Sequence, residues 1–201
     1  MFFVEDTIKK LITEFDRISA ERRHLLENLA TFCKSERNAL LIFICTHNSR
    51  RSHIAQIWAQ TASSYFNIEN VIAYSGGTEA TEFNHRAVNA MRKLGFGIEQ
   101  KTTGENPHYI IRYSDTYPSF EVFSKRYDDV ENSTTGFAAI MTCAHADNNC
   151  PVVAGASVRI SLPFDDPKDY DGTNLESIKY HERAHEIGRE MLYAFSQIKK
   201  L

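Results

Sequence analysis

The stretch LLIFICTHNSRRSHIAQIW, residues 40–58, decides the fold. It opens with an uninterrupted apolar run of strand length, the kind that parallel sheets bury on both faces. It closes with Ile54, Ile57 and Trp58 at helical spacing. A strand that ends on Cys45 and turns straight into a helix is typical of an open parallel sheet, in which ligands bind beyond the carboxyl ends of the strands.

The loop between this strand and helix has the composition of an oxyanion site. Cys45 is followed by five residues, then by Arg51 and Ser52. The Arg51 guanidinium suits tetrahedral oxygens, and its charge and the helix N-terminus favour a thiolate at Cys45. Cysteines are more often buried than reactive, but burial leaves this spacing unexplained. We therefore predict Cys45 and Arg51 as catalytic, with a substrate-binding loop formed by Thr46, His47, Asn48, Ser49, Arg50, Arg51 and Ser52.

Further strands and helices alternate along the chain. Apolar runs at 71–75, 137–142 and 158–162 are strand candidates, and helical periodicity extends from 174 to 198. The order predicts an α/β fold, an open parallel four-stranded sheet with helices on both faces.

Two segments fall outside this alternation. Residues 1–38 contain two amphipathic patterns, which predict an N-terminal helical extension in which Ser19 caps the second helix. The catalytic domain would then span 39–201, interrupted by an insertion at about 105–136. Within the insertion, residues 108–127 hold two β-rich runs around a polar turn, which predict a β-hairpin. The sequence leaves three roles open for the extension and the hairpin: they could cover the sheet edge, form a dimer interface or dock a reductant.

A proton donor for a leaving oxygen is expected after the last strand. Asp165 and Asp166 precede Pro167 there. Because proline restricts the residue before it to extended geometry, we predict Asp166 as the general acid. The alternative for this tripeptide is a solvated turn.

A second pair of thiols lies in the segment TCAHADNNCP. Cys143 and Cys150 are separated by six residues, and the intervening ADNN reads as a turn-rich linker that lets the sulfurs approach. Zinc binding with His145 is the alternative, but structural zinc sites usually have a second cysteine pair, which this sequence lacks. We predict a redox pair, no metal and no bound cofactor.

Composition excludes several functions. The 201 residues carry 23 basic and 26 acidic side chains, a net charge of −3 without a charged tail, so neither nucleic acid nor an anionic membrane is an expected partner. No apolar run approaches a membrane span, and the acidic N-terminus is unlike a secretory signal. We predict a cytoplasmic protein whose four cysteines stay reduced.

The motifs CTHNSRRS, YSGG, TCAHADNNCP and FDDP, in that order, resemble the thioredoxin-coupled arsenate reductases, which share the low-molecular-weight tyrosine phosphatase fold. The resemblance extends from residue 39 to about 198, without the insertion. It implies that Cys45 attacks arsenate while Asp166 protonates the leaving hydroxide. Cys143 then releases arsenite by forming a disulfide with Cys45. Cys150 attacks Cys143 in turn, and thioredoxin reduces the resulting Cys143–Cys150 disulfide.

Four positions depart from the family pattern. His47 stands where glycine is common, Arg50 where cysteine is common, and Gln56 where potassium-binding members have an acidic residue. Lys168 replaces the tyrosine usual in phosphatases that act on phosphotyrosine. Two alternatives therefore remain beside arsenate reduction: a phosphatase acting on phosphomonoesters, and a non-enzymatic oxyanion or redox sensor. Arsenate and phosphate esters are too alike for the sequence to separate, and the oligomeric state is open.

Overall fold

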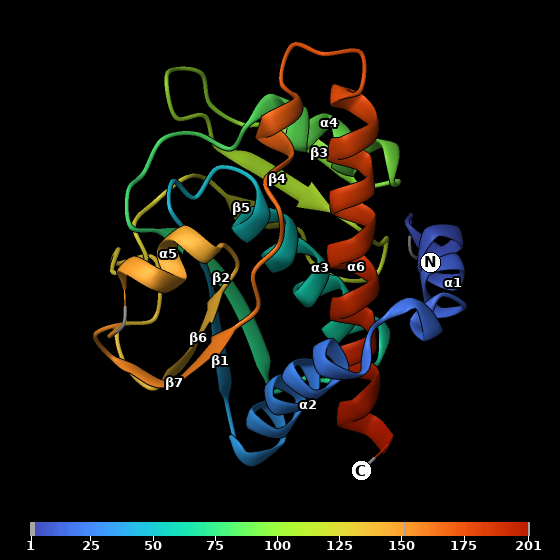
Figure 1. Ribbon diagram of the computed structural model, residues 1–201, viewed down its shortest axis with the longest axis vertical. Helices are drawn as coiled ribbons and strands as arrows, with labels where there is room; N and C mark the ends of the chain where they lie inside the picture. Colours follow the sequence, from blue (N-terminus) through green and yellow to red (C-terminus); the bar gives the residue numbers. More distant parts are fainter. Residues whose placement is uncertain (1–2, 151, 201) are drawn as a thin grey trace.

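The main sheet is parallel throughout. A computed structural model describes residues 3–150 and 152–200 (Figure 1). The sheet has the strand order β2-β1-β6-β7, with all neighbours parallel, as the sequence predicts. Its strands are β1 (Ala39–Cys45), β2 (Val71–Gly77), β6 (Phe137–Met141) and β7 (Ala156–Ser161).

Helices cover both faces of this sheet, which confirms the predicted fold class. The helices α2, α3 and α6 share one buried cluster with one face of the sheet, and the short α5 joins Ile42, Ile44 and Met141 in a second cluster on the other face. The helices are α1 (Glu5–Ile12), α2 (Ala20–Ser35), α3 (Arg51–Tyr65), α4 (His85–Lys93), α5 (Ala144–Asn149) and α6 (Glu176–Lys200), with 3₁₀ turns η1 (Phe15–Arg17) and η2 (Pro167–Tyr170).

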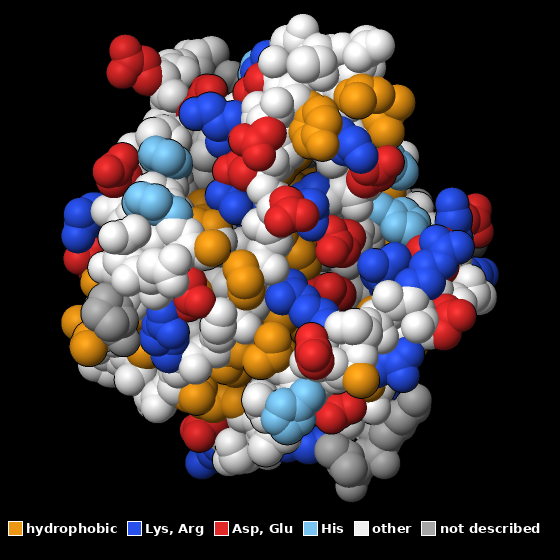
Figure 2. Space-filling model, viewed as in Figure 1, with side chains coloured by type: hydrophobic (Ala, Val, Ile, Leu, Met, Phe, Trp, Pro, Cys, Tyr) orange, Lys and Arg blue, Asp and Glu red, His pale blue; other side chains and the backbone are white. Residues whose placement is uncertain are grey.

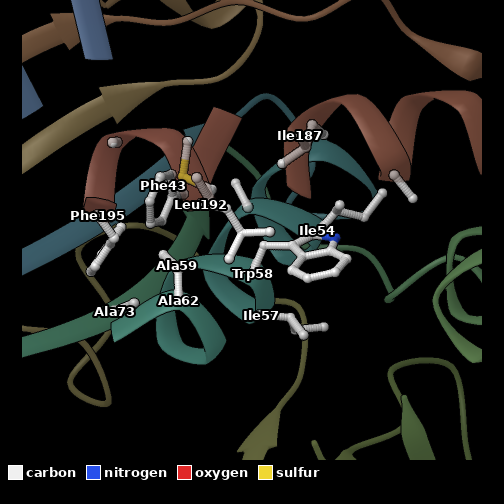
Figure 3. Close-up of a cluster of buried hydrophobic side chains, with 14 of the residues drawn as sticks. Phe43, Ile54, Ile57, Trp58, Ala59, Ala62, Ala73, Ile187, Leu192 and Phe195 are labelled. Carbon is white, nitrogen blue, oxygen red and sulfur yellow. The ribbon is translucent and has the colours of Figure 1, made fainter. Parts of the chain in front are cut away.

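The helix α3 lies between the sheet and α6 and sets the core. Figure 3 shows its Trp58 among apolar side chains from β1 and α6, including Phe43 and Leu192. Gly188 on α6 permits this close approach, because a Cβ atom there would come within 2.5 Å of the Trp58 ring.

We therefore expect Gly188→Ala to destabilise the fold. Overpacking against a rigid, fully buried indole costs about 1 to 3 kcal/mol, while alanine recovers up to about 1 kcal/mol of helix propensity. A net loss of about 1 to 2 kcal/mol should appear as a lower urea midpoint. An unchanged or higher midpoint would show that the α3–α6 contact is looser than the structure has it.

The N-terminal helices pack onto the body of the protein. Ser19 caps α2 as predicted, its side chain accepting a hydrogen bond from the Arg22 N–H at 3.2 Å. Ile8 of α1 and Leu26 of α2 are fully buried in the cluster that also contains α6. The extension therefore shares one core with the rest of the chain, and the domain boundary at residue 38 stays a prediction.

The insertion contributes two strands to a second, separate sheet. The predicted hairpin is confirmed as β4 (Tyr109–Arg112) paired antiparallel with β5 (Phe120–Val122). A third strand, β3 (Gly97–Gln100), joins β4 and was not predicted. It is four residues long and only Ile98 is buried, so the sequence carries no alternation to mark it.

The prediction of a turn-rich linker between the paired cysteines was wrong. Residues 144–149 form α5, with the Cys143 sulfur accepting a hydrogen bond from the Ala146 N–H at 3.3 Å. Asparagine and aspartate have low helix propensity. Tertiary contacts therefore support α5, among them the ion pair of Arg159 with Asp147 at 2.5 Å.

The surface carries both signs of charge. Figure 2 shows acidic and basic side chains interspersed over one face of the molecule, in keeping with the small net charge. Among the described helices, none has the length and apolar character needed to cross a membrane.

Candidate active site

The loop from Cys45 to Ser52 has a buried framework of side-chain hydrogen bonds. The Ser52 hydroxyl accepts a hydrogen bond from Asn48 Nδ2 at 2.8 Å and lies 3.1 Å from the Cys45 sulfur. A hydroxyl so placed can donate to a Cys45 thiolate, the form that attacks. Asn48 is the left-handed residue of this loop, with φ +45°, a conformation that asparagine tolerates well. His47 has no positive φ, so its replacement of a glycine causes no strain of that kind.

The insertion and the β2–α4 connection hold this loop from outside. The His47 carbonyl accepts hydrogen bonds from the hydroxyls of Thr81 and Ser124, each at 3.1 Å. The Asn48 side-chain carbonyl accepts from the Lys125 N–H at 2.9 Å. These supporting residues were not predicted, because nothing in the local sequence reveals contacts to a loop so distant along the chain.

The second glycine of YSGG packs against the same loop. Gly77 pairs with Cys45 across the ends of β2 and β1. A Cβ atom at Gly77 would lie 2.7 Å from both the Thr46 carbonyl oxygen and the Asn48 nitrogen. Only glycine leaves room here for the loop from Cys45 to Ser52, which we call the anion loop.

Arg51 and Asp166 meet beside the loop. The Arg51 guanidinium donates to the Phe164 carbonyl at 2.9 Å and to the Asp166 carboxylate at 2.6 Å, and its buried Nε has no hydrogen-bond partner among the described residues. Asp165 instead contacts Arg183 at 3.1 Å, with 95% of its side chain exposed. Of the two neighbouring aspartates, Asp166 is therefore the one that contacts the loop arginine, and its role as proton donor stays a prediction.

Arg50 is turned to other partners. Its guanidinium donates to the Tyr180 hydroxyl at 2.9 Å, and that hydroxyl donates to Asp171 at 2.7 Å. Burial, followed by the bond to Asp171, raises the pKa of Tyr180 to about 12, which keeps it a neutral donor. The Arg50 guanidinium is therefore occupied elsewhere, and a role of Arg50 in substrate binding stays a prediction that its backbone N–H would have to fulfil.

A second thiol lies beside the anion loop. The Cys143 sulfur is 3.5 Å from the Thr46 hydroxyl, and Cys143 shares a buried cluster with Cys45. Cys150 follows the other end of α5 and is partly exposed. Cys33 is buried elsewhere, and burial raises its pKa to about 12, so it stays an inert thiol.

The helix α5 keeps Cys143 and Cys150 apart. Seven residues of helical rise separate their Cα atoms by roughly 10 Å, whereas a disulfide requires less than about 7 Å. The two cysteines can be joined only after α5 unwinds.

Two histidines, His53 and His145, lie near the site. His53 is fully buried, where burial holds its pKa well below the usual range. A neutral, enclosed imidazole fits a packing role. His145 contacts the site directly, since its Nδ1 is 3.2 Å from the Thr46 hydroxyl. The described residues include no cluster of three or more histidine, cysteine or acidic side chains arranged as metal ligands.

Lys125 is a buried cation beside the loop. Its ammonium lies 4.5 Å from the centre of the Phe123 ring, and burial lowers its pKa to about 8. The unfolded chain, with a lysine pKa near 10.4, binds the proton more tightly than the folded chain. Stability therefore rises as pH increases from about 8 to about 10.5, and below pH 8 the full cost applies.

Lys125→Met should accordingly stabilise the protein. We expect about 2 kcal/mol more free energy of unfolding at pH 7, shrinking above pH 8 and disappearing near pH 10.5. Urea unfolding at pH 7 and 9.5 measures both values, with Lys199→Met, at an exposed position of α6, as the control. An equal gain at the two pH values would contradict the assigned cost of burying this charge.

Comparison with known proteins identifies the family. The arsenate reductase of Bacillus subtilis is 30% identical over 155 residues, which are 77% of this chain and 93% of that protein. The chain belongs to the arsenate reductase family. The arsenate reductase of Halalkalibacterium halodurans is 28% identical over 153 residues, 76% of this chain and 91% of that protein. These relatives confirm the resemblance seen in the sequence motifs, although no family model matches the chain.

Solved structures confirm the fold of this arsenate reductase family member. A low-molecular-weight phosphotyrosine phosphatase from Vibrio cholerae superimposes with a TM-score of 0.52 at 14% identity, covering 79% of this chain and 96% of that one. Primo-1 gives a TM-score of 0.50 at 13% identity, covering 81% and 99%. At such identities the likeness is one of fold alone.

Proposed function

We propose that this protein reduces arsenate to arsenite through Cys45, Cys143 and Cys150, with thioredoxin as the reductant and no bound cofactor. The observation that carries the proposal is the Cys143 sulfur 3.5 Å from the hydroxyl of Thr46, the residue after Cys45. A second thiol at the anion loop has no part in phosphoester hydrolysis but is what a thiol relay requires. The arsenate reductases among the relatives support the same reading.

The first step forms a bond between sulfur and arsenic. The Cys45 thiolate attacks arsenate held by the loop amides and Arg51. An As–O bond breaks, and Asp166 gives its proton to the leaving hydroxide, which departs as water. In the structure Arg51 donates a hydrogen bond to Asp166. A bound oxyanion would therefore share the guanidinium with that acid.

The second step reduces arsenic. The Cys143 thiolate attacks the Cys45 sulfur, forming the S–S bond and breaking the S–As bond, whose electron pair stays on arsenic. Arsenate(V) thereby becomes arsenite(III), and the two thiols supply the two electrons. The position of Cys143 beside the anion loop makes it the nearest candidate for this attack.

The third step moves the disulfide outward. The Cys150 thiolate attacks the Cys143 sulfur, and the Cys45 thiolate leaves and is ready for another arsenate. This exchange requires α5 to unwind, and four of its six residues, one histidine, one aspartate and two asparagines, have low helix propensity. The Cys143–Cys150 disulfide would then lie at the partly exposed end of the segment, where the thioredoxin dithiol reduces it.

Hydrolysis of phosphomonoesters is the second candidate. Cys45, Arg51 and Asp166 alone can carry it, because the attacking thiolate, the anion clamp and the acid are the same as in the first step above. One fold neighbour, the enzyme from Vibrio cholerae, is a phosphotyrosine phosphatase. If the protein is a phosphatase, Cys143 and Cys150 should be dispensable for its activity.

One assay separates the two candidates. Arsenate-dependent loss of NADPH in the presence of thioredoxin and thioredoxin reductase is measured beside aryl phosphate hydrolysis. Arsenate turnover that needs Cys143 supports the proposal. Hydrolysis that is equal in wild type and Cys143→Ser, without arsenate turnover, would leave a phosphatase.

A further inference from the structure

The N-terminal extension reaches the acid-bearing loop through one arginine. We infer that Arg22 of α2 is a positioning residue that holds the segment 163–166 so that Asp166 faces the anion loop. The inference rests on the proposed function only in taking Asp166 as the acid. It gives the extension a part in the reaction itself, beyond closing the core.

The contact runs through Phe164. The Arg22 guanidinium lies over the Phe164 ring, 4.5 Å from its centre, and Phe164 is only 5% exposed. The backbone of Phe164 is bonded at both polar groups: its N–H donates to the Thr142 carbonyl at 3.1 Å, and its carbonyl accepts from Arg51 at 2.9 Å. A ring enclosed by Arg22 therefore fixes the backbone that bonds to the catalytic arginine.

Arg22 is itself held in one orientation. Its Nε donates to the Glu190 carboxylate of α6 at 2.8 Å, with the side chains 17% and 5% exposed. Burial raises the pKa of Glu190 to about 7 despite the arginine beside it. Buried ion pairs are commonly no more stabilising than apolar residues of similar volume. What the pair does supply is a flat guanidinium fixed against a ring, which lysine cannot reproduce.

The segment needs such an anchor. Asp165 is almost wholly exposed, and within the described part of the chain the Asp166 carboxylate is held by Arg51 and the Lys168 N–H alone. Proton transfer requires heavy atoms about 3 Å apart, and a displacement of about 1 Å can cost roughly a hundredfold in rate. Loosening Phe164 should therefore reach the chemistry through Asp166.

The first test measures the anchor without any substrate. Hydrogen exchange is compared at the amides of Phe164 and Lys168 in wild type, Arg22→Met and Arg22→Lys. Arg23→Met is the matched control, because Arg23 is the next residue of α2 and covers a different ring, Tyr193, at 5.8 Å. We expect about tenfold faster exchange in both Arg22 variants and no change in the control. Equal exchange in all four proteins would overturn the inference.

The second test is a double-mutant cycle on arsenate reduction. Arg22→Met should lower kcat about tenfold with little change in KM, and most of that loss should disappear once Asp166→Asn has removed the acid, the small remainder coming from the Arg51 bond to Phe164. A tenfold loss that persists in the Asp166→Asn background would mean a general structural effect and overturn the inference. If exchange responds as expected but wild type reduces no arsenate, the proposed function fails while Arg22 stands as the anchor of the loop.

Discussion

Cys150→Ser is expected to abolish steady-state arsenate reduction while each chain still releases a single arsenite. The first two chemical steps need only Cys45 and Cys143, so arsenite forms before Cys150 acts. The variant then stops with the Cys45–Cys143 disulfide, because serine cannot accept a disulfide bond. Rapid quenching, with arsenite counted per chain, measures the burst, and NADPH loss measures turnover.

Cys33→Ser supplies the control for this variant. Cys33→Ser makes the same chemical change at a buried thiol, and Cys33 lies outside the cluster that contains Cys45 and Cys143. It should retain both burst and turnover. Sustained NADPH loss by Cys150→Ser would remove Cys150 from the relay and make the Cys45–Cys143 disulfide the direct target of thioredoxin.

Asp166→Asn should lower arsenate reduction by about 10² to 10⁴, the usual contribution of a positioned general acid. Asparagine keeps the size of the side chain and can still accept a hydrogen bond from Arg51, so binding of arsenate should change little. The loss should therefore appear in kcat. Single-turnover kinetics of the first step measure it directly.

Asp165→Asn is the matched control for the acid. The two aspartates are neighbours, but Asp165 contacts Arg183 at the surface and not Arg51. We expect its activity to stay within about twofold of wild type, as for most exposed substitutions. A larger loss in Asp165→Asn than in Asp166→Asn would exchange the assignments.

The strongest signals in the sequence were those with a local cause. The run ALLIFI is apolar at every position because β1 is buried on both faces between two layers of the protein, and the parallel sheet follows from it. The anion loop could be predicted because Cys45, Arg51 and Ser52 lie within eight consecutive residues, so that a single short loop brings their side chains together. Pro167 likewise marked Asp166 by a local restriction on the backbone.

Features with a distant cause could not be read. Four of the six residues of α5 are poor helix formers, and the helix is supported by Arg159 of β7, which binds Asp147 from 12 positions further along the chain. Arg50 stands in the anion loop but is drawn away by Tyr180 of α6, 130 residues later. The contact of Arg22 with Phe164 depends on where α2 docks, which amphipathic spacing alone does not specify.

The most direct test of the relay uses fully reduced protein and arsenate with no other reductant. Arsenite is counted, and disulfides are mapped by mass spectrometry after acid quenching. The relay predicts about one arsenite per chain and a disulfide between Cys143 and Cys150, with Cys45 free. No arsenite, with all thiols intact in a protein that hydrolyses aryl phosphate, would contradict it.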